Sequence, residues 1–194
     1  MTVSRSDAPY HHGRLAPVLE QAALEVLAER GTSGVSLREV ARRAGVSHNA
    51  PYHHFGDRQG LLKSVAARGL RDLLAAMTAA RDGATGARGR VAAVGLAYVD
   101  FAIDRPGLFD VIFDPEICDP REPNPVTGPF IEATEAFLRE AVGELVPDAD
   151  DARVEELAAA LWSLVHGLAV LVAAGHLPRE VVPGSLGSML GLSA

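Results

Sequence analysis

The chain has 194 residues, of which 48% are hydrophobic and 22% are charged. These proportions are typical of a globular protein with its own core, and they exclude an intrinsically disordered chain. The single cysteine excludes an internal disulfide framework and a zinc site built from cysteines. The formal net charge of −7 argues against nucleic-acid binding only if the charge is spread evenly along the chain.

The charge is in fact divided unevenly. Residues 1–63 contain 8 Lys and Arg and 6 Asp and Glu, a net charge of +2, whereas residues 64–194 contain 10 and 19, a net charge of −9. The acidic excess therefore belongs to the C-terminal part. A weakly basic N-terminal part predicts modest non-specific affinity for DNA and a dependence on paired half-sites.

Apolar residues at helical spacing predict helices along the whole chain, and strand patterns are scarce. The second helix has a clear start, because Ser36 and Glu39 have the spacing of a capping box, in which each side chain satisfies the other's backbone N–H. Asp57 is expected to cap the fourth helix. The sequence thus predicts an all-α fold of about nine helices, which cover roughly residues 15–30, 37–44, 48–55, 58–82, 90–104, 108–113, 130–145, 157–174 and 181–190.

The eighth of these segments could be taken for a membrane span. Residues 157–174 lack Asp, Glu, Lys and Arg, and their length is at the lower limit for crossing a bilayer. The segment has no basic flank and contains His166, Ser163 and Gly167. These features favour a helix that is buried on both sides in a soluble protein, and we expect no membrane contact.

The second and third helices have the pattern of a helix-turn-helix motif. Ala41 is small where the two helices would cross, Gly45 permits the positive φ of a tight turn, and Val46 would anchor that turn. The motif would present residues 47–49 to a DNA major groove. Three packed helices of an ordinary small bundle would show the same features, so the pattern alone leaves both interpretations open.

A longer stretch around this motif is more specific. Residues 10–62 include YHHGRL, SLREVARRAGVS and APYHHFGDRQGLL, and they resemble the DNA-binding domain of TetR-type transcriptional regulators. Residues 161–167, LWSLVHG, resemble the Trp-x-x-x-His-Gly signature of one TetR subgroup, as do residues 98–109. The resemblance implies a helix-turn-helix DNA-binding domain at 1–56 and a regulatory and dimerisation domain at 57–194, linked by the helix that starts at residue 57.

The resemblance also implies which residues contact DNA. Ser47, His48 and Asn49 are expected at the groove edge, and Tyr52 and His53 at a phosphate or a thymine methyl. Arg38 and Arg58 are expected at phosphates, and an arm with His11, His12 and Arg14 at the backbone or minor groove. Pro51 departs from the aliphatic residue usual in the family. Because proline is tolerated only in a first helical turn, the third helix is expected to be short and to begin at His48 or Asn49.

For the C-terminal domain the resemblance implies a homodimer and a pocket for a small-molecule inducer, which releases a repressor from a palindrome-like operator in double-stranded DNA. No cofactor is expected, and the location is expected to be cytoplasmic. The candidate pocket residues are Tyr98, Phe101, Phe109, Phe113, Phe130, Phe137, Trp162, Val165 and His166. The candidate dimer residues are Leu157, Leu161, Leu164, Leu168, Leu171, Leu186, Met189 and Leu190.

Other functions remain as alternatives to this repressor. The same fold could act as a transcriptional activator, or as a helical interaction module without specific DNA binding. An enzyme is not expected, because the sequence has no G-x-S-x-G elbow, P-loop or H-E-x-x-H motif. A metal site is not expected either, because adjacent histidines such as His53 and His54 point apart on a helix. Cys118 lies in an acidic, proline-rich loop and is interpreted as incidental.

Overall fold

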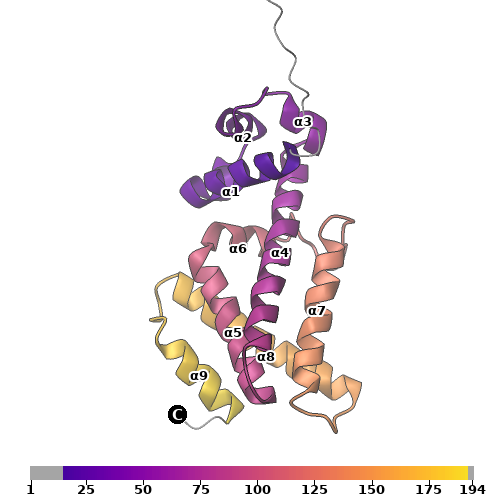
Figure 1. The fold of residues 1–194 in the computed structure, drawn as a ribbon, viewed down its shortest axis with the longest axis vertical. Coiled ribbons are helices and arrows are strands. Elements are labelled where there is room, and N and C mark those ends of the chain that lie inside the picture. The colour runs from indigo at the N-terminus through magenta and orange to yellow at the C-terminus, as the bar shows by residue number, and fades with distance from the viewer. Residues whose placement is uncertain (1–14, 192–194) are drawn as a thin grey trace, which may run out of the picture. The chain divides into compact units, whose positions relative to one another are not determined.

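The computed structural model describes residues 15–191. Those residues form nine α-helices and no β-strand, which confirms the predicted all-α fold (Figure 1). The predicted arm with His11, His12 and Arg14 lies outside the described residues. The helices are α1 (Leu15–Gly34), α2 (Leu37–Ala44), α3 (Ala50–Phe55), α4 (Arg58–Asp82), α5 (Ala87–Asp104), α6 (Pro106–Phe113), α7 (Gly128–Gly143), α8 (Asp151–Ala173) and α9 (Val181–Leu190).

The chain divides into two compact units, and the division falls inside α4, between Leu61 and Leu62. The first unit contains α1, α2, α3 and the first turn of α4. Its core is built from apolar residues at helical spacing, because Leu19 and Val26 of α1 are fully buried together with Val40 of α2. The unit is small, so each of its turns has to be tight to bring these side chains together.

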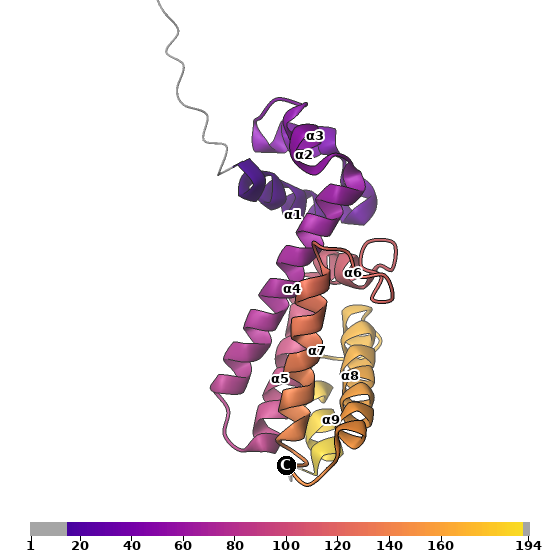
Figure 2. The ribbon, with the colours of Figure 1, turned by 90° about the vertical axis from the view of Figure 1, so that its right-hand side faces the viewer.

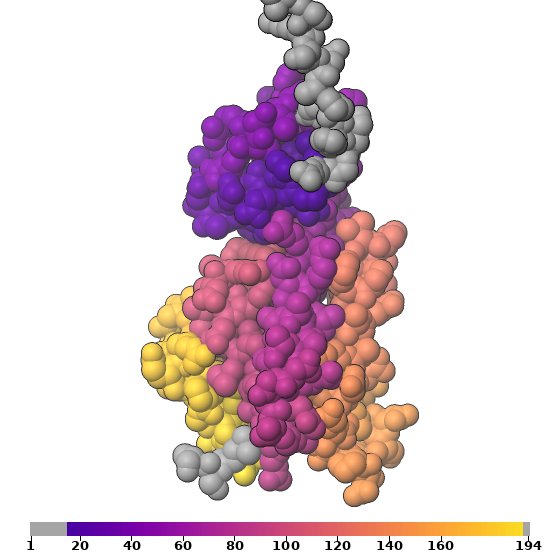
Figure 3. All heavy atoms as spheres, viewed as in Figure 1, coloured from indigo at the N-terminus to yellow at the C-terminus, as the bar shows by residue number. Residues whose placement is uncertain are grey.

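The second unit is arranged around α5. This helix packs against α6, α7, α8 and α9, and its residues Val99 and Ala102 are fully buried. Figure 1 shows α7 upright and α8 crossing obliquely behind α5, and Figure 2 shows the short α6 across one end of these helices. In the space-filling view of Figure 3, α4 covers the middle of the visible face of this unit, between α7 and α5. The unit is therefore a helical bundle with α5 inside it.

The apolar helix α8 is less covered than the sequence predicts. In the single chain only 11% of the 18 most apolar consecutive residues of this helix are buried. Leu168 and Ala169 are the only buried residues of α8. By length and composition alone this helix could cross a membrane. The expectation of a helix buried on both sides is therefore wrong for one chain by itself, because α5 and α7 cover one face and leave the opposite face open.

Asp57 begins α4 as predicted, with its carboxylate accepting a hydrogen bond of 2.8 Å from the N–H of Gly60. This turn also determines which residue can stand at position 60. A Cβ on Gly60 would overlap the backbone carbonyl oxygen of Phe55, whereas a Cβ on Gly89, in the first turn of α5, would meet nothing within 4 Å.

The two glycines therefore make a matched pair of substitutions. Gly60→Ala is expected to lower the free energy of unfolding by roughly 1–3 kcal/mol, because a backbone atom has to move. Gly89→Ala should leave it unchanged or raise it by up to about 1 kcal/mol through better helix propensity. Thermal and urea unfolding followed by circular dichroism would measure both, and equal effects of the two variants would contradict the structure of this turn.

Candidate functional site

The turn between α2 and α3 has the geometry of a helix-turn-helix motif. Gly45 ends α2 in the left-handed conformation, with φ 66° and ψ 29°, which glycine adopts without the strain that a Cβ brings. The N–H of Val46 donates to the carbonyl of Ala41 at 3.1 Å, and Ala41 itself is buried. The turn glycine adopts the predicted positive φ, and the small Ala41 is buried, whereas the hydrogen bond of Val46 to α2 is made by its backbone N–H.

The third helix begins later than predicted. It starts at Ala50, whose N–H donates to the carbonyl of Ser47 at 2.9 Å, and the buried Pro51 occupies its first turn. His48 and Asn49 therefore belong to the turn, and Asn49 makes no side-chain cap hydrogen bond. Because Pro51 faces the core, the opposite side of this segment faces outward.

The predicted DNA-contact residues of this segment are on that outward side. Ser47, His48 and Asn49 are exposed, as is His53, and Tyr52 keeps 45% of its surface accessible. An exposed tyrosine and histidine beside an open turn can donate hydrogen bonds to phosphate oxygens and reach base edges. The structure brings five of the seven predicted residues into one short segment.

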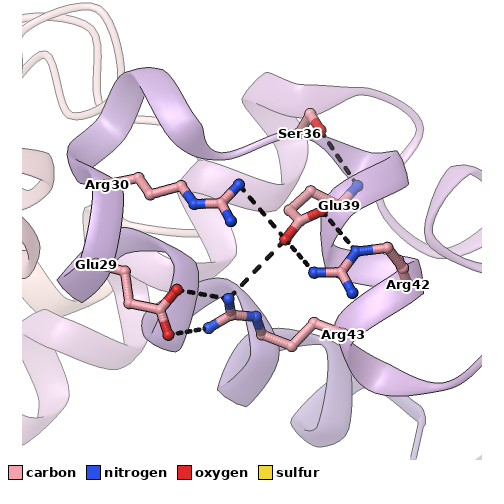
Figure 4. Close-up of polar contacts among 6 residues, drawn as sticks. All are labelled: Glu29, Arg30, Ser36, Glu39, Arg42 and Arg43. Atoms are coloured by element: carbon pink, nitrogen blue, oxygen red, sulfur yellow. Dashed lines mark hydrogen bonds and ion pairs between the residues drawn. The ribbon is translucent and has the colours of Figure 1, made fainter.

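The second helix is tied to its own N-terminus by Ser36, whose hydroxyl oxygen accepts a hydrogen bond from the N–H of Glu39 at 3.2 Å. This is one half of the predicted capping box. The Glu39 carboxylate does not complete the other half as predicted. It accepts two hydrogen bonds from the guanidinium of Arg42, at 2.7 and 2.9 Å (Figure 4).

A set of ion pairs joins α1 to α2, and local patterns in the sequence do not indicate it. Arg43 of α2 donates two hydrogen bonds of 2.6 Å to Glu29 of α1, and Arg30 lies 3.7 Å from the Glu39 carboxylate (Figure 4). The hydrogen bonds from Arg42 are the main cause that holds the pKa of Glu39 at about 2. We call Glu29, Arg30, Glu39, Arg42 and Arg43 the α1–α2 ion network.

This network engages three of the five arginines in the described part of the first unit, residues 15–61. Arg58 is also engaged, because it donates to the carbonyls of Val35 at 2.9 Å and Thr32 at 2.7 Å and so holds the end of α1 near α4. Arg38 is exposed, and among the described arginines of the first unit it is the one with neither an ion pair nor a hydrogen bond from its guanidinium to another described residue. It is therefore the described guanidinium of this unit that is most available to a phosphate.

The second unit contains an apolar cavity of about 210 Å³. Its walls come from five helices, α4 to α8, and from the loop between α6 and α7. The lining residues are Leu70, Leu73, Tyr98, Ile112, Phe113, Pro115, Cys118, Pro120, Ile131, Thr134, Glu135, Leu138 and Trp162.

Five aromatic rings form a cluster beside this cavity: Tyr98, Phe109, Phe113, Trp162 and His166. The Tyr98 hydroxyl is hydrogen-bonded to Nδ1 of His166 at 2.8 Å, and the His166 ring lies 4.7 Å from Phe113 and 5.5 Å from Phe109 between ring centres. Burial raises the pKa of Tyr98 and lowers the pKa of His166. Both side chains are therefore uncharged at neutral pH, which keeps this wall of the cavity free of charge.

The nine aromatic and apolar residues predicted for the pocket separate into three groups. Tyr98, Phe113 and Trp162 line the cavity, and Phe109 and His166 pack behind them. Val165 lines a second hollow of about 40 Å³. The remaining three, Phe101, Phe130 and Phe137, lie under the guanidinium groups of Arg105, Arg71 and Arg81, respectively.

The loop between α6 and α7 closes the cavity, and none of its residues was among the predicted pocket residues. Asn124 organises this loop, because its side chain donates to Thr127 Oγ1 at 2.8 Å and accepts from the N–H groups of Val126 and Thr127. Cys118 is only 6% exposed and faces the cavity, and burial is the main cause that raises the pKa of its thiol. The proline-rich composition was visible, but which face of the loop turns inward depends on its packing against helices that are distant in the sequence, such as α4 and α8.

The predicted dimer residues also separate by exposure. Leu168, Leu186 and Leu190 are buried within the chain, and Leu157 and Leu161 are half-buried. Leu164, Leu171 and Met189 are exposed, together with Val170 and the outer part of Trp162. The exposed residues, Leu164, Leu171 and Met189, are the predicted dimer residues most available to another molecule.

Two segments of this chain match known protein families. Residues 20–65 match the family of bacterial regulatory proteins called tetR, and residues 91–186 match the Tetracyclin repressor-like C-terminal domain. The HTH-type transcriptional regulator YobS of Bacillus subtilis is 30% identical over 182 residues, which cover 87% of this chain and 84% of YobS. The chain belongs to the TetR family of transcriptional regulators.

Two further proteins are similar to this chain. BetI, an HTH-type transcriptional regulator of Burkholderia mallei, is 42% identical over 83 residues, which cover 42% of this chain and 43% of BetI. A solved structure from Rhodococcus sp. RHA1 is 33% identical, covers 95% of this chain and 98% of its own, and superposes with a TM-score of 0.79. TetR-family proteins are DNA-binding regulators and not enzymes, which confirms the prediction that this chain is no enzyme. Among the described residues there is no group of three or more His, Cys, Asp or Glu that could hold a metal ion.

The low pKa of Glu39 predicts how the ion network depends on pH. A carboxylate whose pKa is lowered from 4.5 to about 2 in the folded state contributes stability above pH 4.5 and loses it as the pH falls toward 2. Glu39→Gln should therefore lower the melting temperature at pH 7 but have little effect near pH 2. Glu132→Gln, an exposed carboxylate on α7, is the control and should change neither value. An equal effect of Glu39→Gln at both pH values would show that the ion pairs do not matter.

Proposed function

We propose that this protein is a homodimeric repressor that binds a palindrome-like operator through its helix-turn-helix units and leaves it when a small molecule enters the cavity. The observation that carries the proposal is the exposed segment from Ser47 to His53, which follows a tight turn at Gly45. As in the family, such a segment can enter a major groove, where exposed polar side chains reach base edges. As a soluble TetR-type regulator it would act in the cytoplasm.

The described part of the first unit has few arginines that are free to bind DNA phosphates. The α1–α2 ion network uses Arg30, Arg42 and Arg43, and Arg58 is hydrogen-bonded to backbone carbonyls. Among the described residues, Arg38 is therefore the cation best able to bind a phosphate. The exposed hydroxyl of Tyr52 in α3 can donate a hydrogen bond to another. Few phosphate contacts in each subunit mean weak non-specific binding, so high affinity requires two subunits on two half-sites.

This predicts the effect of removing Arg38. Arg38→Ala should weaken binding to DNA upstream of the protein's own gene by about tenfold and reduce the slope of log affinity against log salt concentration by about 0.9 per subunit. Tyr52→Ala should weaken binding without changing that slope. Arg121→Ala, in the loop before α7, is the control and should bind like the wild type.

The measurement is a fluorescence anisotropy titration at several salt concentrations, with random DNA as competitor. Wild-type protein that binds random DNA as tightly as the upstream region would contradict sequence-specific recognition. Unchanged binding by Arg38→Ala and Tyr52→Ala would contradict the proposed interface.

The exposed face of α8 supports the homodimer. Leu164 and Leu171 lie two turns apart on this helix and are both exposed, and Leu171 has 42% of its surface accessible. A second copy of the chain is the occupant that fits, because a two-fold axis brings the same apolar face from both subunits together. Burial of such side chains contributes about 25 cal/mol for each Å² removed from water.

Gly167 lies on the same open face. In the single chain a Cβ at this position would meet nothing within 4 Å, so the fold of one chain does not need a glycine there. Glycine inside a helix nevertheless costs about 1 kcal/mol relative to alanine. Close approach of a second helix backbone at this point would account for a residue without a side chain.

The dimer is tested by placing a charge on this face. Leu171→Glu is expected to convert a dimer into a monomer, because two carboxylates would be buried near each other, and to reduce operator affinity with it. Val126→Glu introduces the same charge at an equally exposed apolar residue in the loop before α7, and it should remain a dimer.

Size-exclusion chromatography with light scattering gives the molecular mass of each variant. A monomeric wild type, or a Leu171→Glu variant that stays dimeric, would overturn the proposed interface.

We also place the chain in the TetR subgroup with the Trp-x-x-x-His-Gly signature. Trp162 and His166 lie one turn apart on α8, with their ring centres 6.2 Å from each other, and His166 is hydrogen-bonded to Tyr98. The signature residues thus connect α8 to α5 beside the cavity. This arrangement gives a ligand in the cavity direct contact with the helix that carries the proposed dimer surface.

A further inference from the structure

We infer that the cavity binds a small lipophilic amine, with the ammonium group near Glu135 and Trp162 and the apolar part among the buried side chains. This inference rests on the proposed ligand-responsive function and names the class of ligand. It follows from three observations: the size of the cavity, the charges in its wall, and the position of the single tryptophan.

The cavity has room for a ligand of about ten non-hydrogen atoms. The cavity holds about 210 Å³. An apolar cavity of about 150 Å³ in another protein accommodates benzene, so this one has room for a single ring with a short side chain. Its wall consists mainly of aliphatic and aromatic groups, which favours an apolar body.

The charge in the wall is negative. One face of α7, formed by Ile131, Thr134, Glu135 and Leu138 at helical spacing, lines the cavity. Glu135 is the charged residue in that lining, and the lining contains neither Lys nor Arg. An acidic ligand would therefore bring its carboxylate beside a carboxylate without a cation in the wall to balance it.

The mouth of the cavity has further features that favour a cation. Glu135, Leu138 and Trp162 also line an adjoining groove, which adds Glu155 and Arg139. The groove thus has two carboxylates and one guanidinium. Glu135 and Trp162 line both the cavity and the groove, so an ammonium group at this point would lie beside a carboxylate and an indole ring. Both groups attract a cation.

Two polar side chains of the lining are hydrogen-bonded inside the protein. The hydroxyl of Thr134 donates to the carbonyl of Phe130 at 2.8 Å, and the Tyr98 hydroxyl is bonded to Nδ1 of His166. The Thr134 oxygen keeps its lone pairs and the Glu135 carboxylate adds two oxygens, so Thr134 and Glu135 offer acceptors to a ligand. A ligand whose polar end donates hydrogen bonds matches this wall better than one whose polar end only accepts them.

The experiment uses three ligands with one carbon frame: phenylbutylamine, phenylbutanol and phenylbutyrate. Trp162 is the only tryptophan in the chain and lines the cavity, so its fluorescence, excited where the phenyl ring does not absorb, reports binding directly. The amine should bind most tightly and the carboxylate at least about tenfold more weakly, with the alcohol between them.

Two variants locate the ammonium group. Glu135→Gln should weaken binding of the amine by about threefold to tenfold and leave the alcohol unchanged, because an exposed charge pair contributes little more than this. Glu132→Gln removes an exposed carboxylate one turn away on α7 that does not line the cavity, and it should change neither affinity.

The results separate this inference from the proposed function. Equal binding of carboxylate and amine, equal effects of the two variants, or no fluorescence change with any of the three ligands would each overturn the inference. Operator binding is measured without ligand and by a different signal, so its presence or absence judges the DNA-binding proposal independently.

Discussion

A helix that is apolar on every face has to be covered on every face, and α8 is covered on only one side by its own chain. Its inner side packs on α5 and α7 and carries Trp162 and His166 beside the cavity. Its outer side presents Leu164, Gly167 and Leu171. The same helix therefore belongs to the ligand site and to the proposed subunit contact. A ligand that shifts its inner side would also shift the side chains on its outer side.

The DNA-binding unit depends on a different kind of interaction. Its hydrophobic core is small, and two ion pairs of the α1–α2 ion network join the two helices, one between Arg43 and Glu29 and one between Arg30 and Glu39. A further hydrogen-bonded pair, Arg42 and Glu39, lies within α2. These arginines share their hydrogen-bond donors with carboxylates and therefore have fewer to offer to DNA. In the described part of the unit the charge offered to phosphates is thus weaker than the composition suggests, which makes pairing of two subunits essential to the proposed mechanism.

The parts of the fold that depend on neighbouring residues were predictable from the sequence. Gly45 ends α2, Ser36 caps it and Asp57 begins α4, because each of these features needs only a few adjacent residues. The start of α3 was placed one or two residues too early, since a buried Pro51 moves His48 and Asn49 into the turn.

What the sequence could not show depends on residues far apart in the chain. Arg43 meets Glu29 across two helices, and Arg58 reaches the carbonyl of Val35. The cavity wall needs the loop around Cys118 to fold back, and three of the eight predicted dimer residues are buried within the chain. Periodicity identifies an apolar face but not the partner that covers it.

The number and arrangement of chains on DNA test the central claim most directly. A footprint of the protein on the DNA upstream of its gene, combined with the molecular mass of the complex in solution, would measure both. The account predicts an even number of chains that protect two half-sites related by a two-fold axis. One chain on a single unsymmetrical patch, or no protection beyond that of random DNA, would contradict it.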